Sequence, residues 1–553
     1  MKKNIFIGAA WPYANGSLHL GHVASLLSGD ILARYHRLKG DDVLFVSGSD
    51  CHGTPIVVEA EKQGIQPSEI AEKYHQEFTE TLIKGLKFSY DCYTKTTTQN
   101  HQKVVQDIFL KLYKKDYIYP KTEELPYCPQ CKRFLPDRYI EGECPKCHYE
   151  KARGDQCDEC GNLMDARQLL NARCKTCGQS PEWRPSEHFF LRLSSFQEKL
   201  KNFVEQSEGW RPNAKNFTLN LLKQGLNDRA ITRDIEWGVP LPLDGYENKR
   251  IYVWFEAVCG YLSASKEWAK KQGNEDAWQQ FWLKKHDGRI MHYYVHGKDN
   301  IPFHTLIWPT ILMAYGGLHL PDRIISSEYL TLEKQQFSTS RNWAVWLPDF
   351  LKNFDSETLR YYLVINGPET SDTDFSWSEF QAKTNNELIG NLGNLVYRTF
   401  SLIKKNFPNG IEFQKKLDGK SEKLLNQAKE SFDLVGKSIE QGRLRQAIKT
   451  VMQLSEEANR YLSSTAPWKN AKEDPSQAKK DLAIAAHTIH CLAILINPFL
   501  PQTTERINQA VNWDLDKISW QCPLPEFVKI SNLKPLYKKI EDFEVDKQRS
   551  LLG

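Results

Sequence analysis

Short apolar runs alternate with amphipathic segments over the first part of the chain. Ile5 to Ala10 is apolar, turn signals follow at Pro12 and Asn15-Gly16, and Val23 to Leu38 repeats apolar residues at helical spacing. Asp41 to Val46 predicts a second strand. Strand, helix and strand in this order are typical of a doubly wound parallel sheet.

The pattern changes twice further along the chain. Strands are again predicted at Arg250–Phe255 and Ile290–Val295, so we expect the sheet to resume after an insertion. From about residue 386 the pattern is helical, and Leu444 to Tyr461 continues the apolar stripe of an earlier helix. That earlier stripe comprises Leu424, Leu425, Ala428, Phe432, Val435 and Ile439. The sequence therefore predicts an α/β fold followed by a helical bundle.

Length and charge restrict the class of protein. A chain of 553 residues is too long for one core, so about three or four domains are expected. The 73 basic and 69 acidic residues give a net charge of +4, which is too balanced for a protein that coats nucleic acid without specificity. No apolar run approaches the roughly 20 residues that span a bilayer, and no secretory signal is predicted because Pro12 interrupts the first apolar run. A soluble, cytoplasmic protein is expected.

Eight of the 13 cysteines form C-x-x-C pairs within one stretch, a pattern typical of structural zinc. Two pairs complete a four-sulfur site, although spacing alone does not fix which pairs combine. A disulfide-stapled loop is the alternative, disfavoured by the missing signal peptide and by five further cysteines. The pairs are Cys128/Cys131, Cys144/Cys147, Cys157/Cys160 and Cys174/Cys177, and the five others are Cys51, Cys92, Cys259, Cys491 and Cys522.

Two histidines stand at the start of the first predicted helix. His19 and His22 lie one turn apart where unpaired backbone N–H groups favour an anion such as a polyphosphate, with Ser17 as the expected N-cap. Gly21 leaves the backbone bare for a flat ring such as adenine. A helix start that merely carries two histidines is the alternative, because the motif is short.

The run from Pro12 to His22 resembles the "HIGH" signature of class I aminoacyl-tRNA synthetases, and Ala10 to Gly16 is similar to its methionyl-tRNA synthetase form. Four further segments, extending to Trp468, resemble the same family in the same order. The resemblance implies five regions. They are a Rossmann-like catalytic domain in two parts (1–117 and 246–325), a connective insertion with zinc knuckles (118–245), a second-signature and stem-contact region (326–385) and an α-helical anticodon-binding bundle (386–553).

The resemblance also implies two structural zinc ions. The run from Cys144 to Cys160 is similar to the family's single knuckle, so the inner pairs would share one zinc and the outer pairs the other. With only cysteine ligands, neither site leaves an open position for catalysis. The insertion has no room for a large editing domain as well, which argues against the isoleucine, valine and leucine members of the class.

A pocket for methionine should be aromatic, because a thioether accepts only weak hydrogen bonds. By resemblance, aromatic and small side chains line this pocket, Asp50 pairs with the ammonium, and the Tyr261 hydroxyl and the Trp11 amide approach the sulfur. Val258 stands where many members carry proline, a departure that looks like the archaeal and eukaryotic form. Ordinary core packing is the alternative for each aromatic residue. The expected set is Trp11, Tyr13, Asp50, Trp254, Ala257, Val258, Tyr261, Phe303 and His304.

The second signature of the class departs more sharply. Where the family shows Lys-Met-Ser-Lys-Ser, this chain has Gln336-Phe337-Ser338-Thr339-Ser340, so both lysines are missing. We expect Lys334 and Arg341 to compensate beside the triphosphate. A solvated loop that merely holds these two cations is the alternative, with slow activation as its consequence. The expected ATP-binding set is Tyr13, His19, Gly21, His22, Lys298, Ser338, Thr339 and Ser340, and the expected catalytic set is His19, His22, Lys334, Thr339 and Arg341.

Two strings in the helical region are similar to the anticodon-facing strings of the family. A tryptophan can stack on an unpaired base while asparagine and arginine read its edge. Packing of Trp468 against Pro467 inside the bundle is the alternative. The expected anticodon residues are Asn394, Arg398, Pro467 and Trp468.

The resemblance implies a ligase that activates L-methionine with ATP and Mg²⁺ and transfers it to initiator and elongator tRNA(Met), acting as a monomer without a membrane. One alternative is a catalytically impaired relative that only binds tRNA, suggested by Gln336 and Thr339. Another is a nucleotidyltransferase that uses the same phosphate site, but such a protein needs neither the bundle nor Trp468.

Overall fold

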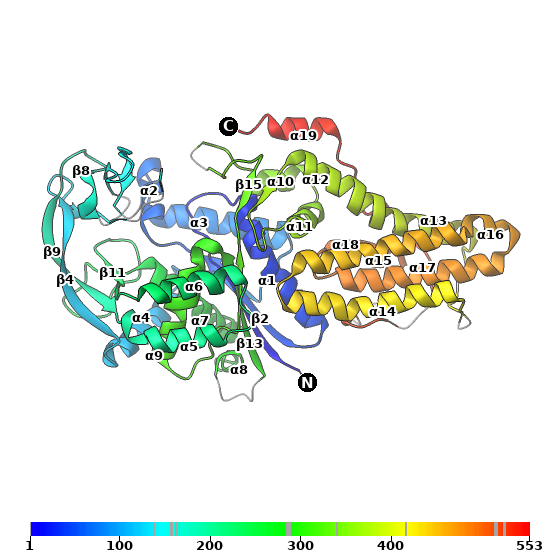
Figure 1. The fold of residues 1–553 in the computed structure, drawn as a ribbon, viewed down its shortest axis with the longest axis horizontal. Coiled ribbons are helices and arrows are strands. Elements are labelled where there is room, and N and C mark those ends of the chain that lie inside the picture. Colours follow the sequence, from blue (N-terminus) through cyan, green and yellow to red (C-terminus); the bar gives the residue numbers. More distant parts are fainter. Residues whose placement is uncertain are drawn as a thin grey trace.

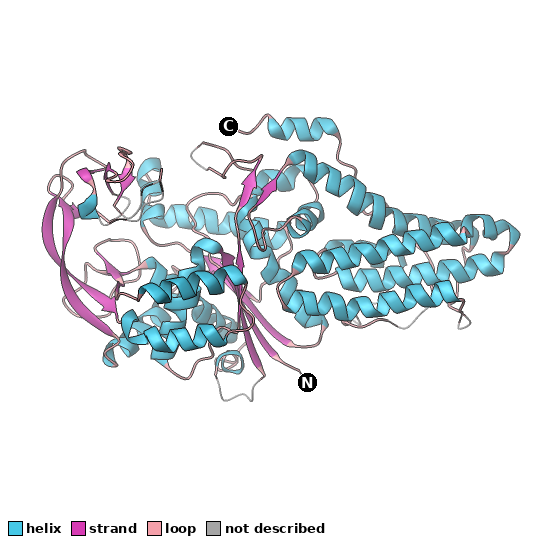
Figure 2. Cartoon of the chain, in the orientation of Figure 1, coloured by secondary structure: helices cyan, strands magenta, loops and turns pink. Residues whose placement is uncertain are grey.

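The computed structural model describes residues 2–136, 139–154, 157, 159–160, 164, 166–283, 289–338, 341–414, 417–511, 513, 518–523 and 527–553. An α/β half and a helical half lie end to end along the long axis (Figure 1). Strands gather in the first half, whereas the second half is drawn almost entirely as helices (Figure 2). In the described part of the chain, no helix is both long and apolar enough to cross a membrane.

A five-stranded parallel sheet organises the α/β half, in the order β14-β13-β1-β2-β3. Both predicted strands near the N-terminus are present, and the expected strand at Ile290–Val295 is β13, which lies between β14 and β1. The strands are β1 (Asn4–Ala9), β2 (Asp42–Ser49), β3 (Cys92–Lys95), β13 (Ile290–Gly297) and β14 (Arg323–Ser327). The doubly wound fold predicted from the sequence is confirmed.

Alternate residues of the strands enter two separate cores, because successive side chains point to opposite faces of a sheet. Ile5 and Ile7 of β1 pack on the face that carries α1 (Leu20–Leu38), whereas Phe6 packs on the face that carries α4 (Gln99–Lys114) and α7 (Val253–Lys271). Burial on both faces explains why β1 reads as a continuous apolar run. Further helices of this half are α2 (Thr54–Gln63), α3 (Pro67–Phe78), η1 (Thr79–Gly85), α8 (Gln279–Trp282), η4 (Lys298–Asn300), η5 (Phe303–Ile307) and α9 (Trp308–Tyr315).

One strand prediction is wrong. Of Arg250–Phe255, only Arg250–Ile251 forms a strand, β12, which pairs with β11 (Thr232–Arg233) outside the main sheet. The helix α7 begins at Val253. The run Tyr252-Val253-Trp254-Phe255 has strong strand propensity, but helical packing against α4 and β2 overrides it.

A long antiparallel ribbon carries the inserted segment. β4 (Ile118–Cys128) and β9 (Glu182–Leu191) pair along their lengths and project from the α/β half (Figure 1). Small strands follow β4, and two helices return the chain to the sheet. These elements are β5 (Arg133–Phe134), β6 (Ile140–Glu143), β7 (Ala152–Arg153), η2 (Ala166–Gln168), β8 (Leu170–Cys174), η3 (Leu193–Phe196), α5 (Gln197–Gln206), α6 (Pro212–Gln224) and β10 (Arg229–Ala230).

The helical half is a bundle built mainly on α14 (Gly419–Glu440), α15 (Leu444–Thr465) and α17 (Pro475–Ile496). Both predicted helical stripes lie on their buried faces. The chain reaches the bundle through β15 (Leu330–Leu332), α10 (Leu347–Asn353), α11 (Ser356–Ile365), β16 (Thr373–Phe375), α12 (Trp377–Ala382), η6 (Lys383–Gly393) and α13 (Asn394–Asn406). It continues with α16 (Pro467–Glu473), α18 (Pro501–Val511) and α19 (Asp542–Arg549).

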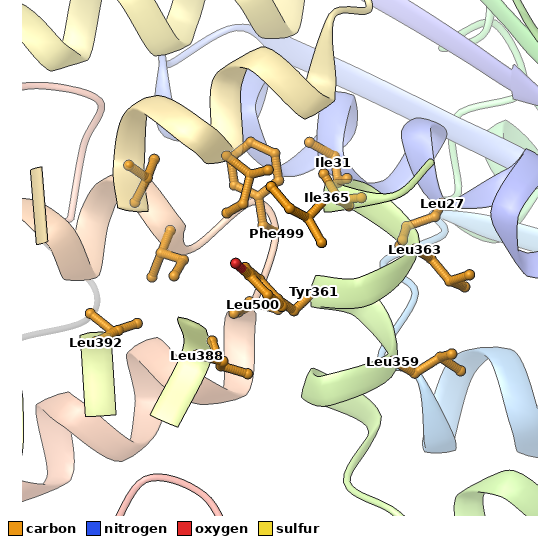
Figure 3. Close-up of a cluster of buried hydrophobic side chains, with 14 of the residues drawn as sticks. Leu27, Ile31, Leu359, Tyr361, Leu363, Ile365, Leu388, Leu392, Phe499 and Leu500 are labelled. Atoms are coloured by element: carbon orange, nitrogen blue, oxygen red, sulfur yellow. The ribbon is translucent and has the colours of Figure 1, made fainter. Parts of the chain in front are cut away.

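The two halves share one hydrophobic core (Figure 3). Leu27 and Ile31 of α1 belong to the same buried cluster as side chains of α11, η6 and the turn at Phe499-Leu500. Arg360 of α11 lies inside this core, where its Nη2 atom is 2.7 Å from Oδ2 of Asp30 in α1. The same guanidinium donates to the backbone oxygens of Phe499, Pro498 and Leu86.

Candidate functional site

The candidate site lies at the carboxyl ends of β1, β2 and β13, where open α/β sheets bind ligands at the point at which the strand order reverses. The loop after β1 carries Trp11 to His19, and Asp50 follows β2 directly. Asn300 to His304 follow β13. These segments, distant in sequence, meet because parallel strands place their ends at one edge.

His19, and not Ser17, is the N-cap of α1. The His19 Nδ1 atom accepts from the backbone N–H of Gly21 at 3.1 Å, and the His22 Nδ1 atom accepts from the backbone N–H of His19 at 3.1 Å. Ser17 donates instead to the Glu77 carboxylate. The two imidazoles thus form a reciprocal capping box, a role that serine and glutamate usually fill.

This capping arrangement fixes the protonation of both rings. Because each Nδ1 accepts a hydrogen bond, the ring proton must sit on Nε2. Burial lowers the pKa of His19 to about 2, with His22 adding to the shift, and burial lowers the pKa of His22 to about 4. Two neutral rings therefore offer N–H donors at a helix N-terminus, as a phosphate site requires.

Backbone hydrogen bonds hold the segment that follows the second signature against the start of α1. The amide of Leu20 donates to the Val345 oxygen and the amide of Leu347 donates to the Leu18 oxygen. The Phe337 ring stacks on the His19 ring with centroids 4.6 Å apart and planes 8° apart. A Cβ atom at Gly21 would lie 3.0 Å from the His19 ring, so glycine lets the ring fold back over the helix start.

The expected cations occupy different surroundings. Lys334 is exposed in a left-handed conformation (φ 66°), and Arg341 is exposed with its Nε atom 3.2 Å from the Ser338 hydroxyl. Lys298 is engaged by carboxylates, because its Nζ atom lies 2.9 Å from Glu328 and 2.8 Å from Asp372. Thr339 and Ser340, also expected at this site, lie outside the described residues.

All nine residues expected to contact methionine line one pocket, together with Ala10 and Asn300. Trp254 forms its rim, because it is 40% exposed, donates to the Tyr13 hydroxyl at 2.6 Å and lies 4.4 Å from the Phe303 ring. The Trp11 ring fits against Gly48 and Gly260, where any Cβ would lie under 3 Å from it. The walls are aromatic, as an uncharged thioether would favour.

One polar pair lies at the base of the pocket. The His304 Nδ1 atom lies 2.8 Å from the backbone oxygen of Asn300, which can only accept, so Nδ1 carries the ring proton. The Nε2 atom of the neutral ring therefore accepts a hydrogen bond from the Tyr261 hydroxyl at 2.7 Å. Burial lowers the pKa of His304 to about 4. The Tyr261 proton is thereby directed at His304, and its oxygen lone pairs remain for other partners.

Asp50 is 3% exposed. Burial raises its pKa well above the ordinary 3.8, and the charge of Glu256 raises it further. A carboxyl group in this position gains by meeting a cationic ligand.

Sequence reasoning missed the network behind Asp50. Glu256 of α7 lies 2.5 Å from the Nδ1 atom of His52 and 3.3 Å from the Nε2 atom of His101, and all three side chains are buried. Burial would raise the pKa of Glu256, but the two histidines outweigh it and lower the value to about 2. His52 lies two residues after Asp50 and could have been noticed in the sequence. No motif marks Glu256 or His101.

The eight paired cysteines form two clusters in the insertion. Cys128, Cys131, Cys174 and Cys177 gather in one cluster, and the four inner cysteines gather in the other. Neighbouring Sγ atoms within these clusters lie 3.4 to 3.9 Å apart. The grouping is the one that the resemblance implied, and both clusters have the donors that fit zinc.

The expected anticodon residues lie together at the far end of the bundle. The Arg398 guanidinium of α13 lies 4.3 Å over the Trp468 ring of α16, and Asn394 is exposed one turn before Arg398. Pro467 is buried as the first residue of α16. Asn394 and Arg398 also line a surface pocket between α13 and α15.

Comparison with known proteins gives the same picture over the whole chain. The family described as "tRNA synthetases class I (M)" matches residues 5–400, and the "Anticodon binding domain of methionyl tRNA ligase" matches residues 412–550. A methionine–tRNA ligase of Dehalococcoides mccartyi (strain CBDB1) is 50% identical with all of both chains covered, and one of Bacillus cereus (strain 03BB102) is 47% identical over 99% of this chain and 98% of the relative.

A solved structure shares the fold. Mycobacterium tuberculosis methionyl-tRNA synthetase bound by methionyl-adenylate superposes with a TM-score of 0.80 at 21% identity, covering 97% of this chain and all of that one. The match extends over both the α/β half and the bundle. By these full-length matches, the chain belongs to the methionyl-tRNA synthetase family of class I aminoacyl-tRNA synthetases.

Proposed function

We propose that this chain activates L-methionine with ATP and transfers the methionyl group to tRNA(Met), initiator and elongator alike. The observation that carries the proposal is the juxtaposition of an aromatic pocket with a helix start bearing two neutral imidazole donors. Family membership supports the same conclusion, and it lends no support to an impaired relative.

In the first step the methionine carboxylate attacks the α-phosphorus of ATP, and pyrophosphate leaves. The Nε2–H groups of His19 and His22 donate to phosphate oxygens, and Gly21 lets the His19 ring fold back over the helix start. Asp50 holds the ammonium, and the pocket around Trp254 and Tyr261 holds the side chain. No side-chain nucleophile is needed, so positioning and charge stabilisation supply the catalysis.

Charge on the leaving pyrophosphate needs further cations. Lys334 and Arg341 flank the second signature, in which Phe337 stacks on His19. We propose that both side chains reach the phosphates when ATP binds, replacing the missing signature lysines. Mg²⁺ would supply charge neutralisation on the triphosphate when bound with it.

The bundle binds tRNA, and the cysteine clusters stabilise the ribbon. Trp468 and Arg398 form a stacking surface for an anticodon base, with Asn394 beside them. Each four-cysteine cluster holds one structural zinc, which would fix the tip of the β4–β9 ribbon. One chain carries every one of these parts, so a monomer suffices.

Exchange of labelled pyrophosphate into ATP tests the activation step. Methionine should support the exchange, while leucine, isoleucine and valine should not, because the aromatic pocket favours a flexible thioether. Exchange with none of these amino acids, under conditions in which ATP binding is measurable, would contradict the proposal. Charging of tRNA(Met) transcripts, initiator and elongator, then tests transfer.

A further inference from the structure

Three metal-ligating side chains meet in the bundle, far from the ribbon that carries the paired cysteines. His487 and Cys491 lie four residues apart on α17, so both project from the same face of the helix. Cys522 approaches from the segment 518–523, which crosses this face. Neither cysteine belongs to a C-x-x-C pair.

The three candidate ligand atoms form a nearly equilateral triangle. The Cys491 and Cys522 sulfurs are 3.6 Å apart, and the His487 Nε2 atom lies 3.9 Å from the first and 4.0 Å from the second. Ligands about 2.0–2.3 Å from a tetrahedral zinc lie roughly 3.6–3.8 Å from one another. The sulfurs of the two four-cysteine clusters are spaced at 3.4–3.9 Å, so the bundle cluster matches their spacing.

Burial makes this arrangement costly without a further partner. Cys491 is fully buried and His487 is 7% exposed. Among the described residues, the His487 Nδ1 atom has no hydrogen-bond partner, and Nε2 meets only the two distant sulfurs. A buried polar atom without a hydrogen-bond partner destabilises the folded state. A metal ion between the two sulfurs would supply the close partner that Nε2 lacks, and Nδ1 would then carry the ring proton.

A disulfide explains less of this geometry. Two sulfurs at 3.6 Å are not bonded, and a disulfide would leave no reason for an imidazole equidistant from both. Two thiolates and one imidazole are instead the donor set of thiophilic cations with a filled d shell.

We propose that His487, Cys491 and Cys522 bind one thiophilic cation, zinc(II) or copper(I), in addition to the metals of the two four-cysteine clusters. Three protein ligands leave one position open, but the cluster lies in the bundle and has no part in the chemistry at β1 and β13. Its effect is mechanical: the metal fastens the segment 518–523 to α17.

That segment also contacts the catalytic half. The amide of Trp520 donates to the Leu38 oxygen at the end of α1, and its indole N–H donates to the Phe432 oxygen in α14. The Trp520 ring meets the Tyr35 ring edge-on at 4.8 Å. A Cβ atom at Gly436 would lie 2.9 Å from the Tyr35 hydroxyl and 3.0 Å from the indole nitrogen, so these elements are closely packed. A bound metal would therefore tie α17, α14 and α1 together through Trp520.

Metal counting on the full-length protein tests this proposal. Zinc and copper would be measured by elemental analysis, and by native mass spectrometry, after purification under reducing conditions. Cys522→Ser should contain one metal ion fewer per chain than the wild type. His487→Asn should show the same loss, which guards against misfolding of either variant alone. The matched control is Cys92→Ser, since Cys92 is buried on β3 outside every described metal cluster, and it should keep the wild-type content.

Equal metal content in the wild type and both cluster variants would overturn the proposal. So would intact-mass and alkylation data showing that Cys491 and Cys522 form a disulfide in the purified protein. The element that disappears distinguishes zinc from copper. None of these readouts depends on methionine activation, so the proposal can fail while the proposed function stands.

Discussion

At the residue scale, the site depends on groups whose protonation the fold has set in advance. His19 and His22 were identified from their spacing, but their capping role was not, because imidazole seldom replaces serine at an N-cap. Asp50 was expected in the pocket from the family resemblance. Its buried neighbours Glu256 and His101 could not be predicted, since only the folded chain brings them together.

Asp50 makes methionine binding depend on pH. Its pKa is raised by burial and by Glu256, so protons compete for the carboxylate that would hold the ammonium. The KM for methionine should rise as the pH falls from neutrality towards that raised pKa, while the KM for ATP changes little. Asp50→Asn should raise the KM for methionine by about 10²-fold or more and flatten this dependence, because a buried charge pair contributes about 2–5 kcal/mol. Exchange kinetics at several pH values measure both effects. An unchanged methionine KM in the variant would show that Asp50 does not hold the methionine ammonium.

Arg341 and Lys334 can be tested for compensation. Arg341→Ala should lower kcat for pyrophosphate exchange by about 10²-fold with little change in methionine KM, because the lost charge acts on the leaving group. Lys334→Asn should act similarly, and asparagine tolerates the left-handed backbone at this position. Lys352→Asn serves as a control, since Lys352 is an exposed lysine paired with Asp349 on α10. Wild-type kcat in both test variants would favour a solvated loop.

At the element scale, periodicity predicted most of the framework. Strands β1, β2 and β13 and the helices α1, α14 and α15 follow apolar patterns that burial alone explains. The strand prediction for Arg250–Phe255 was wrong because tertiary packing outweighs strand propensity there. The bundle cluster was missed because its third ligand, Cys522, comes from a distant loop, although the His487–Cys491 spacing was readable.

The contact between Arg398 of α13 and Trp468 of α16 can be tested through tRNA binding. Trp468→Ala should raise the KM for tRNA by about 10-fold or more, because stacking on one base contributes about 1–3 kcal/mol. Trp468→Phe keeps an aromatic face and should retain most of the affinity. Pyrophosphate exchange should stay at the wild-type rate in both variants, since α16 lies at the far end of the bundle (Figure 1). Equal tRNA KM values for the alanine variant and the wild type would place Trp468 in packing alone.

At the scale of the whole molecule, one core joins the two halves, and its charged centre is the Arg360–Asp30 pair. Burial would raise the pKa of Asp30, but Arg34, Arg360 and Ser89 lower it to about 2. The pair therefore stabilises the fold fully above the ordinary pKa of 3.8, and this contribution is lost as the pH falls through about 2. No sequence pattern indicated this pair, because its partners lie 330 residues apart.

Arg360→Ala should destabilise the protein by about 3–5 kcal/mol at neutral pH, since it leaves Asp30 buried and uncompensated. The midpoint of thermal unfolding should fall accordingly. The deficit relative to the wild type should shrink as the pH is lowered from about 4 towards 2. The double variant Asp30→Asn, Arg360→Met should recover part of the loss. A pH-independent deficit would show that packing, and not charge, accounts for it.

The core in Figure 3 also decides which parts of the chain are separable. Leu388, Leu392 and Phe499 come from the helical half, and they belong to the same buried cluster as Leu27 and Ile31 of α1. A fragment that ends before η6 would expose its part of this apolar cluster to water. The separate bundle would likewise expose its own part. Replacing the bundle with that of a relative would therefore also require changes in α1, the helix whose start carries His19 and His22.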